Sequence, residues 1–192
     1  MASAILMDKK KAVREQLIGA INMAFLHDNF ISSYTLAWAA LDLMRDLLKN
    51  EESKTILDRY LENWKTEGRK EVLKALRAPY NFSKHADRDA DKIIDMPTRQ
   101  NCSLIILFCC WFYETTYGKR TLEMMFFSAW FMANNRKMIE PEFLVGLETP
   151  MLRYEGDGGI QALRVDLRQC NAEESYVKTS ALALNIPDLE LQ

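Results

Sequence analysis

Residues 10–48, KKAVREQLIGAINMAFLHDNFISSYTLAWAALDLMRDLL, decide the fold class. In residues 10–26 the apolar side chains recur at the three- and four-residue spacing of an amphipathic helix: Val13, Leu17, Ile18, Ile21 and Phe25. A second helical face follows: Ile31, Tyr34, Trp38, Leu41, Met44 and Leu48. Polar residues 27–29 end the first helix, and Asn29 or Ser32 can cap the second. This stretch therefore predicts two antiparallel helices.

Helical patterns continue through the rest of the chain. Residues 53–64 predict a third helix, and the helical pattern breaks near Gly68. A new helix is expected to begin at Pro79, because proline suits the first turn of a helix. Residues 93–99 are predicted to form a loop that connects two helices. Further helices are predicted on both sides of Gly118 and near the end of the chain: 101–117, 120–135 and 160–170.

No stretch alternates apolar and polar residues for long enough to indicate a strand. The prediction is an all-α helical bundle of five to seven helices, with residues 1–170 forming a single α-helical bundle domain and residues 171–192 forming a C-terminal tail. Residues 156–159, GDGG, predict a turn before the last helix.

Composition narrows the classes of function. The chain has 192 residues, 48% hydrophobic and 27% charged, and a net charge of -2, so any nucleic-acid contact requires a local cationic patch. Four cysteines without a CxxC pair favour a reducing, cytoplasmic setting. Residues 1–7 do not resemble a signal peptide, and the apolar stretch 102–113 is too short for a bilayer, so no membrane association is expected. No cofactor is predicted.

Residues 77–91, RAPYNFSKHADRDAD, concentrate polar chemistry. In a helix that begins at Pro79, the side chains of Asn81, His85 and Asp89 share one face. Lys84 and Arg88 flank that face and can act on the same ligand.

These residues predict a site for metal-independent cleavage of RNA. His85 would be the acid or base, Lys84 or Arg88 would hold the phosphate, Asn81 would orient the imidazole or the substrate, and Asp89 would raise the proton affinity of the imidazole. The predicted catalytic residues are His85, Asn81 and Lys84, and the predicted ligand-binding residues are Arg77, Tyr80, Arg88, Asp87 and Asp89. The alternative is structural: His85 bonds across a helix junction and the Asp/Arg run is solvated.

Metal sites are not predicted. Residues 87–91 imitate the DxDxD opening of a calcium loop, but Lys92 stands where glycine is required and Thr98 where the bidentate glutamate belongs. A structural zinc site is not expected either, because the chain has only two histidines, His27 and His85.

Residues 28–46, DNFISSYTLAWAALDLMRD, and 81–89, NFSKHADRD, resemble a family of bacterial proteins of unknown function that carry an NFFKHADRD-like motif. The layout of a helical hairpin followed by this motif also resembles the HEPN superfamily. That resemblance implies an all-α bundle, often dimeric, and many such proteins are RNases or toxin components with an RNxxxH-type motif. Asn81 and His85 match its NxxxH part, whereas Tyr80 stands where the motif has arginine. Arg77 is not expected to replace that arginine, because Pro79 should interrupt the helix between them.

Three functions follow as alternatives. The first is an HEPN-like nucleotide-binding, RNA-binding or protein-partner-binding regulatory module, in a toxin–antitoxin or phage-defence setting. The second is a divergent RNase that uses His85, and the third is a structural assembly protein without a ligand site. A homodimer is also predicted, with Asn81, Lys84 and His85 near a cleft between subunits, because segments 104–113 and 122–132 carry more apolar surface than one bundle face usually buries. The alternative is that both segments are the central helices of a larger monomeric core.

Overall fold

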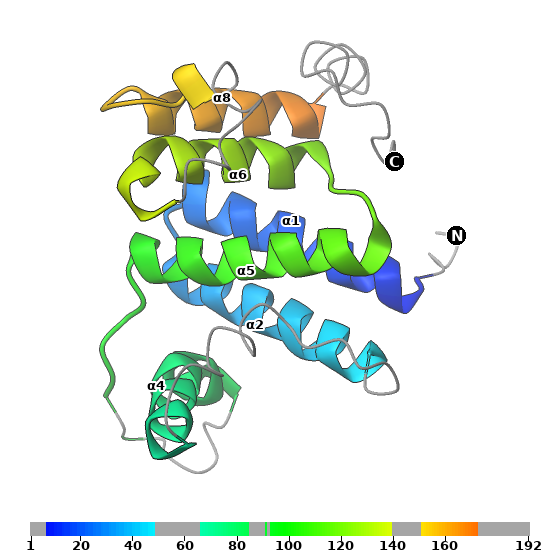
Figure 1. The fold of residues 1–192 in the computed structure, drawn as a ribbon, viewed down its shortest axis with the longest axis vertical. Coiled ribbons are helices and arrows are strands. Elements are labelled where there is room, and N and C mark those ends of the chain that lie inside the picture. Colours follow the sequence, from blue (N-terminus) through cyan, green and yellow to red (C-terminus); the bar gives the residue numbers. More distant parts are fainter. Residues whose placement is uncertain (1–6, 49–65, 85–90, 92, 140–150, 173–192) are drawn as a thin grey trace.

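The computed structural model describes residues 7–48, 66–84, 91, 93–139 and 151–172. Over these residues the chain is helical and contains no strand, which confirms the predicted all-α bundle (Figure 1). The helices are α1 (Lys9–Phe25), α2 (Phe30–Leu47), α4 (Thr66–Lys84), α5 (Arg99–Tyr117), α6 (Leu122–Asn134) and α8 (Gly159–Ala172), with a short 3₁₀ helix, η1 (Arg136–Met138).

Helices α1 and α2 form the predicted hairpin. The Asp8 carboxylate caps α1 by accepting a hydrogen bond from the backbone N–H of Lys11 at 2.7 Å. Asn29 caps α2 in the same way, accepting from the N–H of Ser32 at 3.1 Å, so Asn29 and not Ser32 is the cap. The predicted apolar faces of both helices are buried against each other and against α5.

Helices α5 and α6 pack against the hairpin and against each other. Figure 1 shows α6 lying between α8 and the α1–α5 layer, while α5 covers α1 and α2. Helix α5 starts with a reciprocal cap between Thr98 and Asn101, and it ends at Gly118 in the left-handed conformation, with φ of 78°. The two apolar segments that predicted a subunit interface are thus largely buried by helices of their own chain.

Helix α4 corrects two predictions. It begins at Thr66, includes Gly68, and runs without interruption through Pro79, where a new helix was expected to begin. Proline removes one hydrogen bond to the carbonyl four residues earlier, which here belongs to the exposed Ala75, where water can replace it. The adjacent carbonyl of Leu76 accepts a 2.6 Å hydrogen bond from the Tyr34 hydroxyl of α2, which ties this turn to the bundle.

The end of the described chain follows the predictions. The predicted turn over 156–159 is observed at residues 156–158, with Gly156 at φ of 70°, and α8 starts at Gly159 and extends slightly beyond the predicted helix over 160–170. The predicted helix over 53–64 and nearly all of the predicted tail, residues 173–192, lie outside the described residues. No described helix combines the length and apolar character needed to cross a membrane.

The four cysteines are free, and three are fully buried. The thiols of Cys102 and Cys109 donate hydrogen bonds to the carbonyls of Phe30 and Ala37 in α2, each at 3.3 Å. Burial raises the pKa of Cys102 to about 11 and that of Cys110 to about 12. These residues therefore act as small apolar groups between helices, as their surroundings in the sequence indicated.

Candidate functional site

The exposed side of α4 carries a row of polar and basic side chains. Residues 70, 74, 77, 81 and 84 follow the i, i+4, i+7, i+11, i+14 spacing that places side chains on one side of a helix, and they are Lys70, Lys74, Arg77, Asn81 and Lys84. We call this row the α4 stripe. Helix α4 as a whole has five basic and two acidic residues, a net charge of +3, in a chain whose net charge is -2.

Arg77 anchors the stripe to α2. Its guanidinium donates a 2.6 Å hydrogen bond to the Asp42 carboxylate, and both side chains are about one-third exposed, at 31% and 29%. The same guanidinium lies 5.2 Å from the centre of the Trp38 ring and 6.0 Å from that of Tyr80. Arg77 therefore fixes the position of α4 through an ion pair and cation–π contacts together.

Tyr80 forms the aromatic part of the site. It is buried and stacks on Trp38, with ring centroids 6.2 Å apart and an interplanar angle of 18°. The Lys84 ammonium lies 4.7 Å above the Tyr80 ring and donates a 3.2 Å hydrogen bond to its hydroxyl. Tyr80 therefore holds the Lys84 ammonium in place, while its own ring is packed against α2.

The structure brings together half of the predicted site residues. Arg77, Tyr80, Asn81 and Lys84 share the last two turns of α4, and Asn81 and Lys84 are exposed there. The expectation that Pro79 takes Arg77 out of register is wrong, because the helix is continuous and Arg77 lies one turn before Asn81. The other predicted residues lie outside the described residues: His85, Asp87, Arg88 and Asp89.

The lysines of the α4 stripe determine which ligands the site can bind. None of the ion pairs found among the described residues involves Lys70, Lys74 or Lys84. All three lysines are exposed, and they are distributed along the length of the helix. Such a row suits a ligand with several negative charges.

Sequence reasoning missed two other regions. One is an ionic cluster in which Asp28 accepts hydrogen bonds from Arg99 at 2.7 Å and from Arg164 at 2.7 and 2.9 Å. The other is a pocket of about 340 Å³ between the start of α5 and the end of α6. Both unite residues far apart in the sequence, and no local motif marks them.

Comparison with known proteins does not extend these observations: no model of a protein family, no curated protein and no solved structure matches the chain.

Proposed function

We propose that this protein is an RNA-binding regulatory module, HEPN-like in architecture, whose α4 stripe contacts the phosphate backbone. The observation that carries the proposal is the row of three exposed lysines, none of which forms an ion pair with another described residue, on a helix of net charge +3. Phosphate contacts supply most of the affinity of proteins that bind RNA without sequence preference. A toxin–antitoxin or phage-defence role belongs to the same proposal, and it rests on the resemblance of the chain to the HEPN superfamily.

The contacts around Arg77 support a rigid binding surface. Arg77 is already engaged by Asp42 and Trp38, so it holds α4 in place, while Lys70, Lys74 and Lys84 reach toward the ligand. Asn81 is exposed between Lys74 and Lys84 on the stripe and can offer both a donor and an acceptor to a ribose or a base.

Fluorescence anisotropy with a labelled single-stranded RNA of about 20 nucleotides tests the proposal. The triple variant Lys70→Gln, Lys74→Gln, Lys84→Gln is expected to bind at least tenfold more weakly. Loss of three phosphate contacts should also lower the slope of log affinity against log salt by about 2.

A matched variant separates the stripe from net charge. Lys9→Gln, Lys137→Gln and Arg168→Gln remove the same three charges from exposed positions on other elements, and affinity should stay within twofold of wild type. Equal losses in both triple variants, or no RNA binding by the wild type, would refute the proposal.

A further inference from the structure

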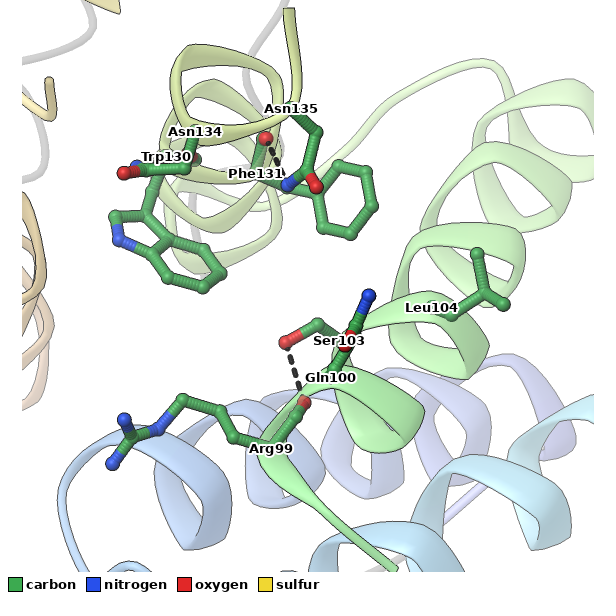
Figure 2. A pocket seen from close by; sticks show the side chains of 8 residues that line it. All are labelled: Arg99, Gln100, Ser103, Leu104, Trp130, Phe131, Asn134 and Asn135. Atoms are coloured by element: carbon green, nitrogen blue, oxygen red, sulfur yellow. Dashed lines mark hydrogen bonds between the residues drawn. The ribbon is translucent and has the colours of Figure 1, made fainter. Parts of the chain in front are cut away.

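A pocket of about 340 Å³ lies between the first turns of α5 and the last turns of α6. Figure 2 shows the rings of Trp130 and Phe131 on the α6 side and Gln100, Ser103 and Leu104 on the α5 side. Its volume is within the range of small-molecule sites, and its walls combine aromatic surface with a few polar groups.

The aromatic wall is fixed before any ligand arrives. The Trp130 ring packs edge-on against Phe25 with centroids 4.8 Å apart, and against Phe127 at 6.2 Å. Phe131 is buried and packs on Phe127 at 6.2 Å. Trp130 itself is only partly buried, and its ring extends from α6 toward α5 in Figure 2. A rigid, partly exposed indole is suited to packing against a planar ring.

The rim of the pocket is also held in place. Asn134 donates hydrogen bonds to the carbonyls of Trp130 and Tyr154, at 2.8 and 2.9 Å, which fixes the end of α6 to the turn before α8. Asn135 donates to the carbonyl of Phe131 at 2.8 Å. On the opposite side, the Ser103 hydroxyl donates to the carbonyl of Arg99 at 2.8 Å. The Ser103 hydroxyl and the Asn134 amide thus donate to backbone carbonyls, as does one N–H of Asn135, and the side-chain oxygens of all three residues can accept hydrogen bonds.

Gln100 supplies the adaptable polar group. Its side chain is exposed, rises from α5 toward Phe131 in Figure 2, and makes no hydrogen bond with another described residue. A glutamine amide offers one donor and one acceptor side by side. That pair matches the adjacent N6–H donor and N7 acceptor of adenine, which glutamine and asparagine recognise in a bidentate manner.

We propose that this pocket binds an adenine ring, packed against Trp130 and hydrogen-bonded by Gln100. The adenine can be part of a free nucleoside or nucleotide, or an unpaired base of an RNA. The inference does not rest on the α4 stripe, because none of the residues that line the pocket belongs to α4.

Calorimetric titration of the full chain tests the proposal with two nucleosides. Adenosine is expected to bind saturably, and N6,N6-dimethyladenosine at least tenfold more weakly, because it lacks the N6–H donors and leaves the acceptor oxygen of Gln100 unpaired. AMP and a pentamer of adenylate are then compared as competitors of adenosine, which distinguishes binding of a free nucleotide from binding of a base carried on RNA.

Two variants locate the binding. Gln100→Ala removes the amide and Leu104→Trp fills the pocket, and each should weaken adenosine binding at least tenfold. Gln161→Ala and Leu152→Trp alter an exposed glutamine and an exposed leucine that do not line the pocket, and they should leave binding within twofold.

The proposal is overturned if the wild type does not bind adenosine saturably. It is also overturned if folded Gln100→Ala and Leu104→Trp variants bind adenosine as tightly as the wild type. The α4 triple variant should keep adenosine binding, so failure of the RNA-binding proposal and failure of this one give different results.

Discussion

The guanidinium of Arg77 lies 5.2 Å from the centre of the Trp38 ring while it donates a 2.6 Å hydrogen bond to Asp42. Both contacts join α4 to α2, which is the main packing partner of α4 among the described helices. Arg77 therefore links the proposed RNA-binding surface to the core of the bundle.

Replacing Arg77 should loosen that link. Arg77→Ala is expected to lower the free energy of unfolding by about 1–3 kcal/mol, because it removes a cation–π contact and leaves the half-buried Asp42 unpaired. Arg77→Lys should recover only part of the loss, since an ammonium lacks the planar fork of the guanidinium. Urea unfolding measures the change, and Lys74→Ala, an exposed change on the same helix, should stay within about 0.5 kcal/mol of wild type. Equal stability of Arg77→Ala and Lys74→Ala would contradict the anchoring role.

The ionic cluster at Asp28 predicts a pH effect on stability. The hydrogen bond from Arg99 is the main cause that lowers the pKa of Asp28, and the charge of Arg164 acts in the same direction. A carboxyl group whose pKa is lower in the folded state adds stability above its unfolded pKa of about 3.9, and that stability is lost as the pH falls toward the folded pKa. The protein should therefore lose stability below about pH 4.

Asp28→Asn isolates this effect. Asp28 has a φ of 50°, a conformation that asparagine also tolerates, so the variant removes the charge without adding backbone strain. Near neutral pH the variant should be less stable by under about 1 kcal/mol, because the carboxylate is half exposed. Below the folded pKa the difference should shrink. If the difference in unfolding free energy between wild type and Asp28→Asn, measured with urea, were the same from pH 3 to pH 7, the Asp28 cluster would not be the source of the pH effect.

Much of the fold could be predicted because helical periodicity reports directly on burial. Val13, Leu17 and Ile21 are buried along α1 as their spacing indicated, and Gly118 ends α5 as a glycine in the left-handed conformation can. The continuity of α4 through Pro79 could not be predicted from local rules. Tyr34, more than forty residues earlier, bonds the carbonyl of Leu76 and helps hold the helix together across the proline.

The candidate sites were predictable only where their residues are close in the sequence. One helix carries Arg77, Tyr80, Asn81 and Lys84, so they could be identified from a single stretch of sequence. The pocket brings Gln100 together with Trp130 through the packing of α5 on α6, and each residue alone looks like an ordinary helix position. Such a site depends on tertiary packing, which periodicity does not encode.

Gly159 should not tolerate a side chain. A Cβ atom at this position would lie 1.9 Å from the carbonyl oxygen of Tyr154 and 2.5 Å from its carbonyl carbon, both backbone atoms. Gly159→Ala is therefore expected to shift the start of α8 and to lower stability by about 2 kcal/mol or more. Thermal unfolding measures the loss. Gly158→Ala is the matched control, because its Cβ would meet no atom within 4 Å. Equal melting temperatures for the two variants would show that the backbone contact does not limit this position.

The homodimer remains a prediction, and the exposed apolar surface that could form its interface is smaller than the sequence indicated. Most of the apolar residues of α5 and α6 are buried within one chain, and Leu104 is 36% exposed. Sedimentation equilibrium at micromolar concentration should give twice the chain mass of 22.3 kDa, whereas the monomer mass throughout would reject the dimer. If α4 lies near the subunit cleft, Lys84→Glu should also change the dissociation constant. An unchanged constant would place the interface elsewhere.

Any RNA cleavage by this protein is expected to depend on His85. Proton transfer near neutral pH most often uses imidazole, and His27, the other histidine, is an exposed residue between α1 and α2. His85→Ala should reduce the rate of cleavage of a mixed RNA panel at least a hundredfold, in keeping with the loss of a general acid or base. His27→Ala should leave the rate unchanged, and a chelator should not inhibit if the reaction uses no metal. Cleavage at the wild-type rate by folded His85→Ala, or no cleavage by the wild type, would remove the RNase alternative. Binding of the same RNA by the α4 stripe would then remain as a separate activity, because Lys70, Lys74 and Lys84 need no proton transfer to hold phosphate.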